Sequence, residues 1–447
     1  MSRTAAERRA ARKRKQQHRG RHRAESAGQQ SDATLLVRHL LHAGAMGAAG
    51  LAEVSPEEVA VRLAELDPGV DGTGLASGLL AEQLAGMEEH GWQPADAVHV
   101  VRRKASARAV RLAVALVLAR SAQLDAAAWA PEEWLFQLSA LETEIPGARG
   151  GPAAPVAAWR LAEALDAGTA WREVLTVTAL WLRAVELAPV GPPPSRWGAG
   201  AQRQGTPGRR ATSSSAPDSR VLGRIRGLLA KAESTEFPEE AEALTAKAQQ
   251  LMTRYAVDAA VLDAEQGRSF AAEVRARRVH VEDPYTEEKV RLLDEVGRAN
   301  AVRVVLHRGL GMATAVGLPV DLELTELLFT SLLVQATRAM AETGRAGNRR
   351  TRSPSFRRAF LLAYAIRIGE RLAQARDETT AEAESSAGTS LVPVLTARAQ
   401  AVDETLSELF PDLVHTSTRV SNAQGWHAGR LAAEHADLRR GRGQVTR

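Results

Sequence analysis

The chain has 447 residues, of which 45% are hydrophobic, and a formal net charge of +5 at pH 7. It contains no cysteine, which excludes disulfides, thiol nucleophiles and cysteine-ligated zinc or iron–sulfur clusters. No apolar run is long enough to cross a bilayer, and no hydrophobic segment follows the basic N-terminus. We therefore expect no secretory signal and a cytoplasmic location.

Residues 1–31 contain ten basic and two acidic side chains, so the positive charge is concentrated there and the remainder is slightly acidic. Without apolar periodicity, this segment is predicted to be a disordered basic tail. Clustered cations are sufficient for sequence-independent nucleic-acid binding through counterion release. The alternative is a tail that only keeps the protein in solution. The candidate phosphate-binding residues are Arg8, Arg9, Arg12, Lys13, Arg14 and Lys15.

Residues 32–187 show helical periodicity and no strand alternation, which predicts an all-α domain. The sequence has no convincing fixed-period repeat, so an irregular bundle is favoured over a degenerate helical-repeat array. Trp159, Trp171 and Trp181 recur at helix-like intervals and are predicted to be core residues. Residues 188–219 combine Pro, Gly and Ser and are predicted to be a flexible linker. The expected helices are 35–41, 56–66, 75–87, 95–118, 131–141 and 155–187, the last with a break near Gly168.

Residues 220–260 are predicted to form a helical hairpin. Val221, Ile225 and Leu229 belong to one apolar stripe, and a matching stripe runs through 241–255. Pro238 favours the start of a second helix, because its fixed backbone angle suits the first helical turn. The connection at 234–237 is short, so the two helices should pack antiparallel.

The hairpin segments RIRGLLAKAEST and FPEEAEALTAKAQQLMTRY resemble the domain of unknown function 2786 family. In that family a short helical unit is often followed by a second uncharacterised domain, and residues 269–438 are similar to such a partner. This second resemblance depends on SFRRAFLLAYAIRIGERL (355–372) and GWHAGRLA (425–432). It implies no established activity and no catalytic residues.

The charges of the hairpin argue against a helix-turn-helix DNA reader. Glu239, Glu240 and Glu242 open the second helix, where phosphates would repel them. Arg220 and Arg224 lie instead at the start of the first helix, which is already the positive end of its dipole. We expect either a weak anionic partner at that end or simple solvation next to the linker.

Residues 268–440 are predicted to form an α+β domain with a small mixed sheet covered by two long helices. Residues 441–447 form a short basic tail. The expected helices are 286–298, 321–341, 355–384, one that ends at 409 and one that begins at 423. The expected strands are 271–281, 302–306, 312–318, 391–395 and 413–420.

The segment 345–358 contains six arginines and no acid directly before a predicted helix. Arginine forks, hydroxyl groups and the free amides of a helix start all favour phosphate, so this is the best internal anion site. The alternative is a solvated loop between two long helices. The candidate ligands are Arg349, Arg350, Arg352, Arg357 and Arg358.

The acids Asp321, Glu323 and Glu326 open a predicted helix and are weak candidates for a hard cation, together with His280 or His307. Such acids more often cap a helix or face its dipole. The run GLGMATAVG lacks the ending of a phosphate loop, and we expect no cofactor.

These observations favour a non-catalytic nucleic-acid-associated protein that binds phosphates through its arginine-rich segments, while its helical N-terminal domain engages another protein. One alternative is an enzyme that acts on nucleic acid or a phosphorylated substrate through the α+β domain. Another is an assembly adaptor that binds no nucleic acid.

Overall fold

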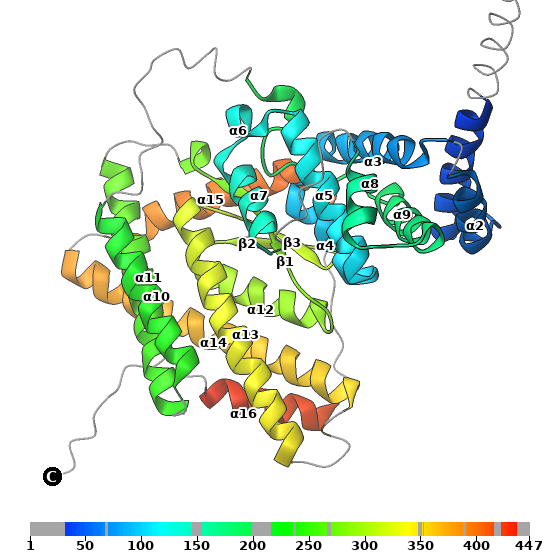
Figure 1. The fold of residues 1–447 in the computed structure, drawn as a ribbon. Helices are drawn as coiled ribbons and strands as arrows, with labels where there is room; N and C mark the ends of the chain where they lie inside the picture. The colour runs from blue at the N-terminus through cyan, green and yellow to red at the C-terminus, as the bar shows by residue number, and fades with distance from the viewer. Residues whose placement is uncertain are drawn as a thin grey trace, which may run out of the picture. The chain divides into compact units, whose positions relative to one another are not determined.

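The computed structural model describes residues 32–67, 70–144, 154–198, 216–235, 238–265, 270–346, 351, 353–387, 390–414 and 422–435. The chain divides into two compact units, Met1–Arg203 and Gln204–Arg447. Both are mostly helical, and the second also contains a small sheet (Figure 1). In the described ranges, no helix has the length and apolar character needed to cross a membrane.

The described part of the first unit consists of helices, in agreement with the predicted all-α character. A helix covers residues 32–48. It is followed by α2 (Pro56–Leu66), α3 (Gly72–Glu89), α4 (Pro94–Lys104), α5 (Ala107–Gln123), α6 (Ala126–Trp129), α7 (Glu132–Glu144), α8 (Pro155–Ala162), α9 (Ala167–Leu182) and the 3-10 helix η1 (Pro194–Arg196).

Side-chain caps explain two breaks between these helices. The apolar stretch 95–118 is divided between α4 and α5, because Ser106 Oγ accepts a hydrogen bond from the amide of Ala109 at 3.1 Å. Asp166 accepts from the amide of Thr169 at 2.9 Å and starts α9. The predicted break near Gly168 therefore lies at this cap, a few residues before the glycine.

The predicted tryptophan core of this unit is confirmed. Trp159, Trp171 and Trp181 are all buried. The indole N–H of Trp181 donates to the backbone oxygen of Ala97 at 3.0 Å, and that of Trp159 donates to the oxygen of Arg108 at the same distance. These bonds offset the cost of burying the polar edge of each ring.

The second unit begins with the predicted hairpin, formed by α10 (Ala216–Ser234) and α11 (Pro238–Glu265), which pack against each other (Figure 1). Pro238 is the first residue of α11, as predicted, and α11 continues well beyond Tyr255. The apolar stripe of α10 is buried at Leu222, Ile225 and Leu229. These residues join a core that also contains residues of the sheet and of the helices that follow.

The sheet contains β1 (Arg275–His280), β2 (Arg303–His307) and β3 (Met312–Gly317) in the order β1-β3-β2. Both strand pairs are antiparallel, so the prediction of a mixed sheet was wrong. The reason lies in the short turn between β2 and β3, where Gly309 and Gly311 have positive φ and the chain reverses at once. β1 then pairs with the other edge of β3. As a result, β1 and β2 run in the same direction but are not neighbours.

Among the described residues of the second unit, five further helices follow the hairpin, after a 3-10 turn η2 (Phe270–Ala272) that precedes β1. The prediction of a strand at 391–395 was wrong, because this segment lies at the start of α15. Pro393 belongs to the first turn of that helix, where its missing N–H has no cost. Of the strand predicted at 413–420, residues 413 and 414 are not in a strand and the rest lie outside the described residues. The helices are α12 (Thr286–Ala299), α13 (Pro319–Ala346), α14 (Pro354–Ala387), α15 (Val392–Leu409) and α16 (Ala423–His435).

Candidate functional site

Part of the predicted anion-binding set lies outside the described residues. This applies to the tail residues Arg8, Arg9, Arg12, Lys13, Arg14 and Lys15, and to Arg349, Arg350 and Arg352 of the segment between α13 and α14. The structure does describe Arg357 and Arg358 on the first turns of α14. It also describes Arg220 and Arg224, but α10 begins at Ala216, so these two arginines lie in its second and third turns and not at its start as predicted.

The start of α14 is fixed by Ser353. Its hydroxyl accepts a hydrogen bond from the amide of Phe356 at 3.2 Å, and Pro354 is the first residue of the helix. Arg357 is partly exposed and Arg358 is exposed. Arg358 Nε lies 3.8 Å from Oε1 of Glu288, and at 67% exposure its guanidinium remains accessible to solvent and solutes. The first turns of α14 therefore present two cations at the positive end of a helix dipole.

A second helix starts beside it. Asn422 accepts a hydrogen bond from the amide of Gly425 at 2.8 Å and so caps the start of α16. The side-chain amide of the same residue donates to Ser355 Oγ at 3.4 Å. This contact places the starts of α14 and α16 side by side, and the positive ends of two helix dipoles face the same region.

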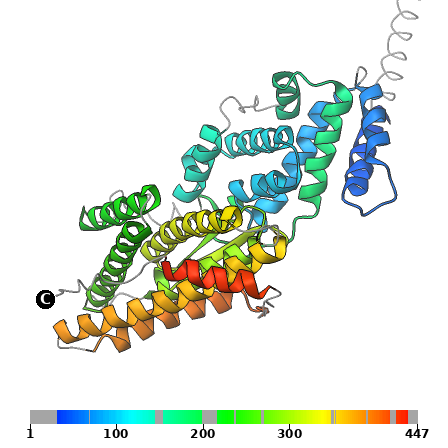
Figure 2. The same ribbon diagram turned by 90° about the horizontal axis from the view of Figure 1, so that it is seen from below.

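Two glycines allow this close approach. A Cβ added to Gly425 would lie 2.4 Å from the backbone oxygen of Phe356, and one added to Gly429 would lie 2.1 Å from that of Phe360. α16 therefore lies directly on the backbone of α14 and runs in the same direction, as Figure 2 also shows. The two segments on which the second sequence resemblance depends, 355–372 and 425–432, are thus one helix–helix interface.

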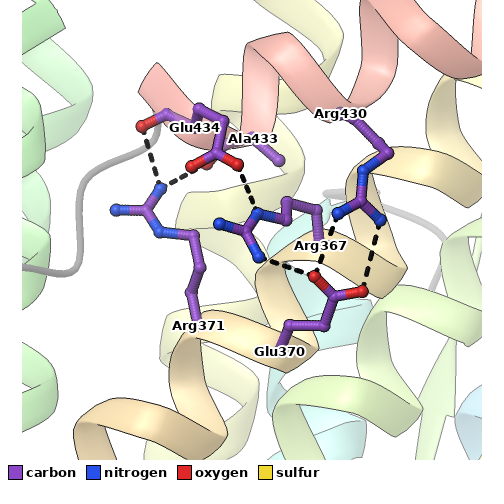
Figure 3. A network of polar contacts seen from close by, with 6 residues as sticks. All are labelled: Arg367, Glu370, Arg371, Arg430, Ala433 and Glu434. Carbon is purple, nitrogen blue, oxygen red and sulfur yellow. Dashed lines mark hydrogen bonds and ion pairs between the residues drawn. The ribbon is translucent and has the colours of Figure 1, made fainter.

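The far end of this interface is held by a polar network (Figure 3). Arg367 donates to Glu434 at 2.5 Å and to Glu370 at 2.6 Å, and both terminal nitrogens of Arg430 donate to Glu370 at 3.2 Å. Arg371 is buried and donates to the backbone oxygens of Ala433 and Glu434 at the end of α16. A cation at the negative end of the helix dipole is favourable. The network therefore fixes the axial position of α16.

Hydrogen bonds from arginine keep this network charged. The bond from Arg430 is the main cause that lowers the pKa of Glu370, and the bond from Arg367 does the same for Glu434. Both partners also raise the pKa of Arg367. A carboxylate whose pKa is lower in the folded than in the unfolded state stabilises the folded state at every pH above its unfolded pKa. The contribution of Glu370 and Glu434 is therefore present at neutral pH. It is lost only as the pH falls through the lowered values.

The three candidate metal-binding acids do not converge. Asp321 pairs with Arg398, Glu323 pairs with Arg226, and Glu326 pairs with Arg277. Burial raises the pKa of Asp321 despite its arginine partner, which is also buried. Throughout the described part of the chain, no group of three or more His, Cys, Asp or Glu side chains could hold a metal ion. The acids therefore serve as ion-pair partners that join elements of the second unit.

The arginines of α10 belong to another part of the unit. Arg220 and Arg224 are exposed, and the next arginine on the helix, Arg226, contacts Glu323 in the first turns of α13. The predicted acidic start of α11 is partly neutralised, because Lys231 Nζ lies 2.8 Å from Glu240 Oε1. The structure thus places the arginines of α10 and those of α14 against different helices.

One basic cluster was missed by sequence reasoning. Arg278 of β1 contacts His307 of β2 and Thr314 of β3, and Arg303 of β2 contacts Asp403 of α15. Of these residues, only Arg278 lies in the basic run 275–280. Its contact with His307 depends on the strand register, which the sequence alone does not show.

The comparisons with known proteins concern a small part of the chain. Residues 220–259 match the model of the family described as Protein of unknown function (DUF2786), which corresponds to the hairpin of α10 and α11. Searches of the curated proteins and of the solved structures find no match to the chain. The hairpin thus matches the DUF2786 model, as its sequence resemblance predicted, while the similarity of residues 269–438 to a companion domain stays a prediction.

Proposed function

We propose that the protein is a non-catalytic nucleic-acid-associated protein, whose second unit contacts phosphates at the neighbouring starts of α14 and α16. The observation that carries the proposal is the contact of Asn422 with Ser355, which joins the two helix starts beside Arg357 and Arg358. Helix starts and arginine forks both favour phosphate oxygens.

The basic tail would add to the same electrostatic attraction. Its six candidate cations increase the local concentration of the protein near a polyanion, and the effect falls with ionic strength. Arg220 and Arg224 would make a weaker, separate contact. In this proposal the tail supplies affinity and the two helix starts supply a fixed position.

We also infer that residues 269–438 form the companion domain that often follows the DUF2786 unit. Its support is that the two resembling segments pack on each other, through Gly425 and Gly429 on the backbone of α14. The hairpin contributes to the same core as these segments. This gives a physical reason for the DUF2786 hairpin and its companion domain to occur together.

An assembly adaptor is the second candidate, and exposed apolar side chains on the first unit favour it. Phe136 is 75% exposed and Leu161 is 83% exposed, while Trp129 is exposed on the short helix before α7. Large exposed apolar groups are typical of protein-binding surfaces. In the leading proposal these side chains contact a protein partner, and for an assembly adaptor this contact is the whole function.

Binding to a generic DNA duplex, measured by fluorescence anisotropy as a function of salt, separates these candidates. We expect a steep salt slope for the full chain. The double variant Arg357→Gln, Arg358→Gln should reduce that slope by about one to two. The matched control is Arg298→Gln, Arg376→Gln, which removes two exposed arginines of the same unit away from the two helix starts.

Substitution of the six tail residues by glutamine in the full chain should lower the affinity further, most strongly at low salt, and should reduce the salt slope. No detectable binding at low salt would exclude the nucleic-acid proposal and leave the adaptor. Equal slopes for the α14 variant and its control would remove the assignment to α14 and α16.

A further inference from the structure

The strand register gives the sheet two different faces. Directly paired residues of antiparallel strands lie on the same face. Val279, Ala313 and Ala315 are therefore on one face together with Val304 and Leu306, and all five belong to the core of the second unit or pack against it. The other face carries Arg278, His280, Arg303, His307 and Thr314, together with the buried residues Ala276, Met312 and Val316.

Two of the basic groups on this second face are in contact. Arg278 Nη1 lies 2.7 Å from His307 Nε2, and it also donates to the hydroxyl of Thr314. A guanidinium N–H can only donate, so Nε2 of His307 is the acceptor in this contact. Arg278 is buried, whereas Arg303 retains 33% exposure of its side chain. The face thus combines a buried guanidinium with an accessible one.

Helix α15 covers this face and contacts β2 and β3. Its Asp403 accepts two hydrogen bonds from Arg303, at 2.7 Å from Nε and 3.2 Å from Nη2. Phe410, which follows the helix, lies against His307 with ring centroids 6.0 Å apart. The helix is anchored elsewhere by Arg398, which pairs with Asp321 and donates to the backbone oxygen of Ala256 at 2.9 Å.

We propose that the basic face of the sheet is a second phosphate-binding site for nucleic acid, and that Asp403 occupies Arg303 in the position a phosphate would take. The ligand class rests on the proposed function, but no residue of the α14 and α16 site is used. A two-bond contact of arginine with a carboxylate has the same fork geometry as its contact with a phosphate.

The ion pair is well suited to exchange. Asp403 is 51% exposed, so water and solutes reach the pair from outside. Exposed pairs add little stability, and an incoming phosphate offers Arg303 an equivalent partner. Arg398 holds α15 at a separate point, so the helix need not leave the sheet for the exchange to occur. Asp403 therefore competes with phosphate for Arg303 and weakens the binding of phosphate at this site.

The test compares Asp403→Asn with Asp377→Asn in the full chain, by anisotropy with the same duplex. Asp377 is 70% exposed on α14, so its substitution gives the same change in net charge away from the sheet. We expect Asp403→Asn to bind about fivefold more tightly than Asp377→Asn, because it frees Arg303. Thermal melting of both variants checks that the fold is retained.

Arg303→Gln supplies the second arm. Arg303→Gln should weaken DNA binding. In the Arg303→Gln background, adding Asp403→Asn should raise the affinity no more than adding Asp377→Asn does. Equal affinities of Asp403→Asn and Asp377→Asn, or a gain that persists without Arg303, would overturn the proposal. Competition by inorganic phosphate as effective as that by duplex phosphates would assign the face to a small anion and also overturn it.

The two proposals fail separately. If Asp403→Asn does not change DNA binding while substitution of Arg357 and Arg358 reduces the salt slope as expected, only the sheet site is excluded. An Asp403 effect without any effect of the α14 arginines removes only the site at the helix starts.

Discussion

Among single residues, Glu88 of α3 makes stability depend on pH. Its side chain is buried, and Arg120 Nε donates to it at 3.3 Å. Burial outweighs this partner and raises the pKa of Glu88 to about 7 from an ordinary value of 4.5. The folded state therefore binds more protons than the unfolded state between these values. The free energy of unfolding of the first unit should fall as the pH rises through this window and then level off.

Glu88→Gln should remove this decline. We expect a free energy of unfolding higher by roughly 1–3 kcal/mol above pH 7, and little change near pH 4. Seven of the eight tryptophans lie in the first unit, so tryptophan fluorescence in a Trp426→Phe background reports on it. Glu82→Gln, an exposed position of the same helix, is the control. An unchanged pH profile in Glu88→Gln would show that another group is responsible.

Residue-scale predictions from sequence succeeded where residue type and helical spacing agree. Trp159, Trp171 and Trp181 recur at helix-like intervals and are buried, whereas Trp129 is exposed. Glu88 gave no comparable signal, because its neighbour Glu89 is of the same type and is exposed. Only the packing of α3 distinguishes the two.

At the scale of elements, the position of α16 depends on the absence of two Cβ atoms. Gly429→Ala would place a methyl group 2.1 Å from the backbone oxygen of Phe360, so the helices must separate. We expect a loss of about 1–3 kcal/mol in the unfolding free energy of the second unit. Hydrogen exchange in α16 and in the facing part of α14 should become faster.

Gly227→Ala provides the control for this prediction. A Cβ at Gly227 of α10 meets no atom within 4 Å, so the change should leave stability unchanged or raise it by about 0.5–1 kcal/mol. If Gly429→Ala behaves like Gly227→Ala, the close approach of α14 and α16 is not what holds α16.

The helical periodicity of α10 to α14 extends over enough residues to locate these helices from the sequence. A short apolar run does not show whether it belongs to a strand or to a helix. The run LVPVL at 391–395 fits a strand or a helix start equally well, and the helix that follows decides in favour of α15. The contact between α14 and α16 was also beyond sequence reasoning, although its two segments carried a resemblance. Nothing in either segment names the other as its partner.

At the scale of the whole second unit, the hairpin is part of a larger core. Ile225 of α10 and Met252 of α11 lie in the same cluster as Leu293 of α12 and Phe360 of α14. Ile225→Ala should therefore lower the unfolding free energy of the complete second unit by about 2–5 kcal/mol. Hydrogen exchange in α12 and α14 should rise together with that in α10.

Lys247→Ala, an exposed position of α11, should leave these exchange rates unchanged and is the control. Faster exchange confined to α10 and α11 would mean that the hairpin unfolds independently. The sequence predicted the hairpin from its local stripes, but it could not show the shared core. That core joins residues far apart along the chain.

The parallel arrangement of α14 and α16 has a consequence for biosynthesis. Translation releases α14 first, and the intervening segment with α15 must follow before Gly425 and Gly429 can reach the backbone of α14. Until then α16 does not cover the surface of α14 around Phe356 and Phe360, and other nascent chains can contact that surface. Packing of α16 on α14 therefore follows the synthesis of the whole segment between them.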